Sequence, residues 1–282
     1  MKKFLKKLIG FSAIIILVFA CAIIWRTYAC RTLDFSFPEN KTELFVGASQ
    51  PYWAIDTTLI QSAINFSKAG EGYMYTYLKL KKLLEDNPHI KNVFIQCSPS
   101  DIVGNQDKTY FNDNEMGAFM PSFYSFYTAE EWLLYKNHKT QAIRSMYQKA
   151  LRPGGLFVDK WDFGGQVSKK EGVKSKFDSN KARPKTALSP NPINIHYLHK
   201  ILELCESHGT KLYAICFPAY KPEEYYDINE FNRIIKTEFP KLDFIDYTDF
   251  SVSDNERYDH YHLNWYGAQK FTKEIKQRFN IE

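Results

Sequence analysis

Two short segments at opposite ends of the chain carry the residue types needed for acyl-transfer chemistry. Ser49 follows Gly47 in a turn after a short apolar run, and Asp259 precedes His262 by three residues. This spacing lets the carboxylate turn back and accept the Nδ1–H of the imidazole, which leaves Nε2 free to take a proton from a serine hydroxyl. Each segment alone is also consistent with a plain turn or a hydrogen-bonded surface loop. The two segments taken separately leave these alternatives open.

The residues around these segments predict the elements that position them. Apolar runs typical of buried strands alternate with amphipathic helical patterns, which predicts an α/β fold with a parallel sheet covered on both faces. We expect strands at 43–47, 64–67, 92–97, 211–217 and 243–247, and helices at 56–64, 73–84, 196–205, 225–237 and 264–279. Ligands bind at the carboxyl ends of such strands, and Ser49 lies at that end of the first strand.

The middle of the chain, residues 104–190, breaks this alternation and carries much of the aromatic excess. Thr128 and Glu131 form a capping box that predicts a helix running to about Leu151 and ending at Arg152–Gly155. Residues 164–190 are rich in Lys, Ser, Gly and Pro and are expected to form a mobile surface loop. The aromatic side chains either form a lid or groove that stacks on sugar rings, or pack the insertion onto the core.

The serine after the first strand and the Asp-x-x-His before the last helix together resemble the SGNH/GDSL hydrolase superfamily. The resemblance covers residues 42–103 and 192–282. It implies a three-layer, flavodoxin-like α/β fold with about five parallel strands. It also implies that Ser49 is the nucleophile, His262 the general base and Asp259 the orienting carboxylate of a serine esterase or O-acyltransferase.

The same resemblance implies oxyanion or substrate-binding positions in two further blocks. Ser67 and Gly70 fall in the second block, and Ser100 and Asp101 in the third. The family patterns are usually Gly-Asp-Ser and Gly-x-Asn-Asp, whereas this chain has Gly47-Ala48-Ser49 and Ser98-Pro99-Ser100-Asp101. These departures leave a second function class open, a catalytically impaired domain that binds a glycan or a membrane partner.

The N-terminus predicts a membrane anchor. Four lysines at positions 2, 3, 6 and 7 precede an uncharged stretch from Leu8 to Trp25, which spans roughly 27 Å as a helix. The lysine excess predicts that the N-terminus stays inside and that the body is extracytoplasmic, in the periplasm or at the cell surface. We therefore expect an anchor at 1–31, a linker at 32–41 and one domain at 42–282 with its insertion at 104–190. A cleaved signal peptide and a lipoprotein modified at Cys21 are the alternatives.

Composition and motifs limit the classes of ligand and partner that we expect. The net charge of +5 is mild and forms no basic stripe, so we expect no nucleic acid. No nucleotide loop follows the first strand, and Asp259, His260 and His262 lack further ligands at recognisable spacing, so we expect no cofactor and no metal. The sequence does not decide whether Cys97 and Cys216 form a disulfide. The resemblance and the anchor together imply action on an acylated surface polysaccharide, in some relatives beside a multi-span membrane acyltransferase.

Overall fold

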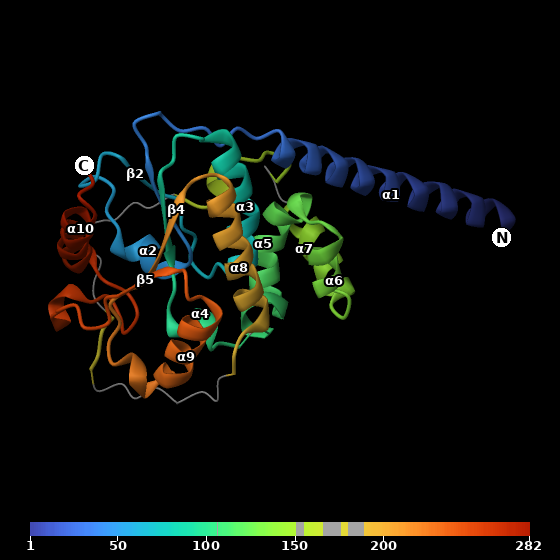
Figure 1. The fold of residues 1–282 in the computed structure, drawn as a ribbon. Helices are drawn as coiled ribbons and strands as arrows, with labels where there is room; N and C mark the ends of the chain where they lie inside the picture. Colours follow the sequence, from blue (N-terminus) through green and yellow to red (C-terminus); the bar gives the residue numbers. More distant parts are fainter. Residues whose placement is uncertain (106, 151–154, 166–175, 180–188) are drawn as a thin grey trace. The chain divides into compact units, whose positions relative to one another are not determined.

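The structure is a computed structural model that describes residues 1–105, 107–150, 155–165, 176–179 and 189–282 (Figure 1). The chain divides into two compact units. The first consists of Met1–Asp34 with Tyr110–Phe163, and the second of Phe35–Thr109 with Gly164–Glu282. The division that we expected from the sequence, with a linker at 32–41 and one domain at 42–282, remains a proposal.

The second unit contains a five-stranded, all-parallel sheet, which confirms the predicted α/β fold. Its strands are β1 (Glu43–Val46), β2 (Ala63–Asn65), β3 (Asn92–Gln96), β4 (Lys211–Cys216) and β5 (Asp243–Asp246). Their order in the sheet is β2-β1-β3-β4-β5, which is the flavodoxin-like order with the switch point between β1 and β3. The strands are short and apolar because both faces of the sheet are covered; Leu44, Phe45 and Val46 are fully buried.

Helices cover the sheet in two layers (Figure 1). The helices of this unit are α2 (Ser49–Ala54), α3 (Tyr73–Asp86), α4 (Pro99–Ile102), α8 (Pro192–Ser207), α9 (Ile228–Glu238) and α10 (Trp265–Phe279), with short helical turns η4 (Pro222–Glu224) and η5 (Asp254–Glu256). Helix α3 packs against α8 on one face, and α2 packs against α10 on the other. Between α2, α10 and the sheet lies a core that includes Phe45, Phe94 and Phe271.

One predicted helix of this unit is wrong. We expected a helix from Asp56 to Ile64, but the helix that follows β1 is α2, which begins at Ser49 and ends at Ala54. The Asp56 carboxylate instead accepts hydrogen bonds from the N–H and the hydroxyl of Thr58, at 3.0 and 2.7 Å. These bonds stabilise a local turn that competes with a helix start.

The first unit is helical. It contains α1 (Lys2–Arg31), α5 (Asp113–Phe123), η2 (Tyr124–Phe126), α6 (Ala129–Leu134), α7 (Lys139–Ala150) and η3 (Lys160–Phe163), and the π-helical segment η1 (Asp107–Phe111) leads into it. The capping box of Thr128 and Glu131 is present at the start of α6. The single helix predicted from there to Leu151 is wrong, because it is broken between α6 and α7 at residues 135–138. The predicted stop at Arg152–Pro153–Gly154 and most of the predicted loop at 164–190 lie outside the described residues.

We call residues 110–163 the insertion helices. Their aromatic side chains mainly pack on one another. Tyr110, Phe119, Phe123, Tyr124 and Tyr127 are all buried. The Phe123 ring meets Phe163 edge-on at 5.1 Å, and the Tyr127 ring stacks on Tyr135 at 5.9 Å. The break after α6 therefore places Tyr135 inside this aromatic core. These rings are therefore used in the packing of the first unit itself, and their buried faces are not available to stack on sugar rings.

Among the described residues, one helix, α1, is long and apolar enough to cross a membrane. It continues past the uncharged stretch to Arg31. Most of its residues up to Val18 are exposed, whereas Arg26 and Cys30 are buried. The C-terminal part of α1 is therefore packed within the first unit.

Candidate active site

The turn after β1 places Ser49 at the first position of α2. Gly47 makes this turn possible, because its φ of +124° lies in a region that favours glycine and a Cβ there would lie 2.8 Å from the Cβ of Gln96. The backbone then turns through Ala48 into the helix. The first N–H groups of a helix have no acceptor within the helix. The Ser49 N–H is one of these groups, and it lies next to the Ser49 hydroxyl.

The structure brings the three predicted triad residues together. The Ser49 Oγ lies 2.7 Å from Nε2 of His262, and both oxygens of Asp259 lie 2.9 Å from Nδ1 of the same ring. Ser49 and His262 are 213 residues apart in sequence. The distances match those of a nucleophile, a base and an orienting carboxylate.

The loop that carries His262 is held by its own backbone. The Tyr258 N–H donates to the His262 carbonyl at 2.9 Å, and Arg257 pairs with Leu263 in an isolated antiparallel bridge. The Asp259 carboxylate accepts the N–H groups of Tyr261 and His262 at 2.8 and 3.0 Å. The carboxylate therefore shapes the loop and orients the imidazole at the same time.

These contacts also set the charge state of Asp259. Partial burial opposes the ionised form, but the hydrogen bonds from His262 and Tyr261 outweigh it and hold the pKa of the Asp259 carboxyl below its usual range. Asp259 is therefore a carboxylate at neutral pH. A carboxylate at Nδ1 favours the tautomer whose Nε2 accepts a proton from Ser49.

Gln96, which was not among the predicted site residues, supports the turn at residues 47–49. Its Oε1 accepts the N–H of Gln50 at 3.1 Å, and its Nε2 donates to both carboxylate oxygens of Asp101 at 3.2 and 3.0 Å. Asp101 also accepts the N–H and the hydroxyl of Ser98, and burial raises the pKa of its carboxyl although these hydrogen bonds act in the opposite direction. A polar residue at the carboxyl end of a buried strand is the signal that points to Gln96.

The other predicted binding positions lie in the turns after β2 and β3. The turn after β2 contacts the nucleophile turn, since the Lys68 N–H donates to the Gly47 carbonyl at 2.9 Å. Ser67 is buried, and its Oγ has no hydrogen-bond partner within the described residues. Gly70 is exposed. The Ser100 hydroxyl lies 2.8 Å from that of Ser98 and forms a hydrogen bond with Tyr226.

Half-buried aromatic rings surround the imidazole, and the sequence did not single them out either. The Trp53 ring lies 6.3 Å from the His262 ring and stacks on Tyr258 at 5.2 Å with an interplanar angle of 9°. On another side Tyr261 lies against Tyr226, whose pKa is raised by burial and by its hydrogen bond with Tyr261. Trp53 lies four residues after Ser49, one turn along α2, so it shares a face of that helix with the nucleophile.

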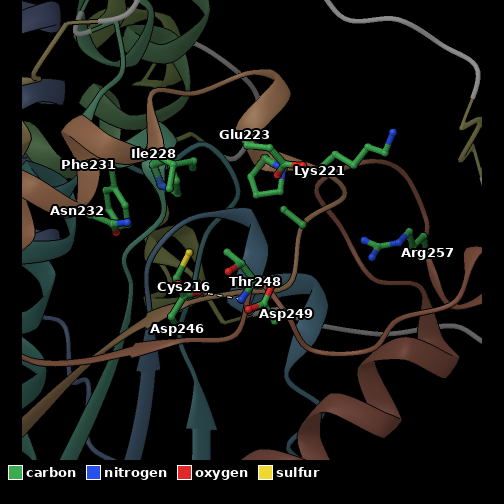
Figure 2. A pocket seen from close by; sticks show the side chains of 13 residues that line it. Cys216, Lys221, Glu223, Ile228, Phe231, Asn232, Asp246, Thr248, Asp249 and Arg257 are labelled. Atoms are coloured by element: carbon green, nitrogen blue, oxygen red, sulfur yellow. Dashed lines mark hydrogen bonds between the residues drawn. The ribbon is translucent and has the colours of Figure 1, made fainter.

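A separate cavity of about 320 Å³ opens at the carboxyl ends of β4 and β5 (Figure 2). Charged groups of both signs line it, including Lys221, Arg257, Asp246 and Asp249. None of the triad residues belongs to its lining. The cavity and Ser49 are therefore distinct features of the same sheet edge.

Neither a metal cluster nor a disulfide is found among the described residues. They contain no group of three or more His, Cys, Asp or Glu side chains placed to hold a metal ion. All five cysteines are free thiols, so the disulfide left open between Cys97 and Cys216 is not formed. Burial raises the pKa of both thiols, which makes them poor nucleophiles.

Comparisons with known proteins give a distant likeness. No protein-family model and no curated protein matches this chain. Among solved structures, the chain is similar to a GDSL-like lipase from Bacteroides thetaiotaomicron VPI-5482, with 12% sequence identity and a TM-score of 0.40 over 92% of this chain and 98% of that chain. At this level the likeness says nothing about substrate or activity.

Proposed function

We propose that this chain is a membrane-anchored serine esterase or O-acyltransferase that acts on an acylated surface glycan through an acyl-enzyme at Ser49. The observation that carries the proposal is the continuous hydrogen-bonded chain from Ser49 Oγ to His262 Nε2, and from His262 Nδ1 to the Asp259 carboxylate. A serine hydroxyl is a weak nucleophile until a base removes its proton. In the proposal His262 is that base, and its Nε2 accepts the proton.

In the first half of the reaction Ser49 Oγ attacks the ester carbonyl while His262 Nε2 takes the hydroxyl proton. The resulting imidazolium is stabilised by the Asp259 carboxylate. When the tetrahedral intermediate collapses, the ester C–O bond breaks, and the imidazolium gives its proton to the leaving alkoxide. The products are a free alcohol and an acyl group bonded to Ser49.

The oxyanion of the intermediate needs hydrogen-bond donors in a fixed position. The Ser49 N–H is the donor supplied by the nucleophile turn. The Gln50 N–H is already bonded to Gln96, so its role is to fix the turn. Ser67 and Ser100, whose hydroxyls lie in the turns after β2 and β3, are the proposed further donors, with Gly70 and Asp101 shaping those turns.

In the second half of the reaction an acceptor oxygen attacks the acyl-enzyme and His262 again transfers the proton. Water as the acceptor gives hydrolysis, and a sugar hydroxyl gives transfer. The aromatic rings of Trp53, Tyr258 and Tyr261 beside His262 support a carbohydrate as one partner, because aromatic faces pack against the apolar faces of sugar rings. The proposal includes a multi-span membrane acyltransferase as the partner protein that supplies the acyl group.

The proposed location is a single-pass membrane protein with its main domain outside the cytoplasm. The support is the length and apolar character of α1 and the four lysines that precede its uncharged stretch. Polysaccharides of the cell surface are accessible on that side.

The test is active-site labelling of the full chain in mild detergent with a fluorophosphonate probe. Ser49→Ala and His262→Ala are expected to abolish labelling and to lower hydrolysis of a p-nitrophenyl ester by ~10⁶-fold. Ser207→Ala and His208→Ala are matched controls, because both residues are exposed at the end of α8, and both should retain the parental rate. Labelling that persists in Ser49→Ala would contradict the proposal.

The second candidate is a domain that binds the glycan without turning it over. Two features of Ser100 favour it. Its short side chain stands where the family has an asparagine donor, and its hydroxyl already lies 2.8 Å from that of Ser98. This candidate predicts no labelling of the parental chain together with retained binding of an acylated oligosaccharide in calorimetry. Probe labelling that depends on Ser49 would exclude it.

A further inference from the structure

The first unit exposes several large apolar side chains to a third or more of their surface. Phe157 is 82% exposed, Leu133 64% and Ile143 54%. We call the following set the insertion's apolar surface: Trp132, Leu133, Ile143, Leu156, Phe157 and Trp161. Where such groups gather on one surface they mark a protein or membrane interaction site.

The insertion helices contact the part of α1 that precedes the end of its uncharged stretch. The Phe19 ring meets Tyr147 of α7 edge-on at 5.2 Å, and the Tyr124 hydroxyl lies 3.3 Å from the Ile23 carbonyl. The indole N–H of Trp25 donates to the Leu156 carbonyl at 3.2 Å. Figure 1 shows α7 beside the last turns of α1, where the two helices are in contact.

Arg26, the first charged residue after the uncharged stretch, donates hydrogen bonds to the insertion helices. Arg26 is fully buried, and its Nε donates to the Pro121 carbonyl at 2.8 Å while another guanidinium N–H donates to the Gly155 carbonyl. Arg31 donates to the Ser125 carbonyl at 2.8 Å. These bonds fix the insertion helices at a defined height along α1, so the depth of α1 in a bilayer also sets theirs.

That depth follows from the lysines. If the insertion helices stayed wholly in water, the hydrocarbon would have to end before Phe19, and its ~30 Å thickness would then take in Lys2, Lys3, Lys6 and Lys7. Charged side chains are strongly disfavoured there. With Leu8–Trp25 in the bilayer instead, the segment from Phe19 to Trp25, about 10 Å long, lies within it together with its contacts.

We infer that the insertion helices lie in the membrane–water interface and bury the insertion's apolar surface among the headgroups and upper acyl chains of the bilayer that α1 crosses. The inference rests on α1 spanning the membrane and does not depend on catalysis. Exposed cations of the same segment fit this position: Lys136 lies in the break after α6, and Lys139 and Arg144 lie on α7. Basic side chains reach lipid phosphates while neighbouring apolar groups sink to ~5–10 Å.

The test measures lipid and water contact at single positions of the full chain in phosphatidylcholine–phosphatidylglycerol vesicles. A bimane label is placed at Leu133→Cys, Ile143→Cys or Phe157→Cys in a Cys21→Ala background, because Cys21 is exposed and the other cysteines are buried. Ile16→Cys, in the exposed part of α1, reports on the anchor itself. Glu206→Cys, exposed on α8, is the reference for a label in water.

Labels at positions 133, 143 and 157 should be quenched by lipids brominated in the upper acyl chain at least half as strongly as the label at 16. Their quenching by iodide should be several-fold weaker than at 206. If iodide quenches them as it does position 206 while the label at 16 responds to lipid, the inference is overturned and the surface belongs to a membrane protein absent from these vesicles. If the label at 16 does not respond to lipid, α1 does not span and the inference falls with it.

Discussion

Replacing Gly47 by alanine is the sharpest perturbation of the nucleophile turn. At a φ of +124° an L-residue is strained by about 1–3 kcal/mol. The new Cβ would also lie 2.8 Å from the Cβ and 3.1 Å from the backbone N of Gln96, an overlap that costs about 1–3 kcal/mol. The free energy of unfolding should therefore fall by about 2–6 kcal/mol, a large part of the ~5–15 kcal/mol of a typical domain.

Gly209→Ala is the matched control. Its φ of +65° is also positive, but no atom lies within 4 Å of the added Cβ, so only backbone strain of about 1–2 kcal/mol applies. The entropy that alanine removes from the unfolded chain is the same in both variants and cancels in the comparison.

Urea unfolding of the full chain in detergent measures the two losses, and fluorophosphonate labelling measures the position of Ser49. Relief of the overlap would move the turn away from β3, and a ~1 Å displacement of a reacting group costs about 100-fold in rate. Gly47→Ala should therefore label at least ~100-fold more slowly, whereas Gly209→Ala keeps the parental rate. Equal unfolding midpoints and equal labelling rates in the two variants would refute the account of this turn.

Three further substitutions test the surroundings. Asp259→Asn should slow labelling by ~10⁴-fold. Because the pKa of this carboxyl is lowered in the folded protein, its contribution to stability is complete above the unfolded value of about 3.9 and is lost as pH falls through the lower folded pKa. The difference between parent and variant in urea unfolding should therefore shrink below pH 4 and not stay constant. Gln96→Leu leaves the Gln50 N–H without its acceptor and should cost about 1–3 kcal/mol and slow labelling, and unchanged values would contradict its positioning role. Lys79→Met leaves the fully buried Glu71 without its ion-pair partner and should cost about 3–5 kcal/mol, most of it recovered by adding Glu71→Leu; a double variant less stable than the single one in urea would argue against this.

The sequence predicts the sheet well because its strands are buried on both faces. Continuous apolar runs ending at polar or glycine residues mark β1, β3 and β4 to within one residue. The same pattern fails where local hydrogen bonds decide the backbone. Asp56 bonds to Thr58 rather than starting a helix. It also fails after α6, where the helix predicted from Thr128 is broken and Tyr135 lies in an aromatic core.

The triad residues are predictable because their spacing has a local meaning, whereas their support is not. Asp-x-x-His closes a short loop whose bonds all lie between neighbours in sequence. Gln96 acts on a residue 46 positions away, and the Trp53 ring stacks on Tyr258, which comes after β5 in the sequence. Such contacts depend on how the strands are ordered in the sheet, which periodicity does not specify.

The distance between Ser49 and His262 is set by the packing of the two helices that flank them. Helix α2 begins at Ser49, and α10 begins three residues after His262. The two helices pack together, and the buried Thr272 joins them by accepting the Asp56 N–H at 2.9 Å and donating to the Ala54 carbonyl at 3.1 Å. Because each end of the triad is attached to a rigid element, the 2.7 Å contact does not rely on either loop alone. In the proposed mechanism, activation of Ser49 is therefore coupled to the stability of the α2–α10 face, and variants that loosen this face should lose labelling before they lose the fold.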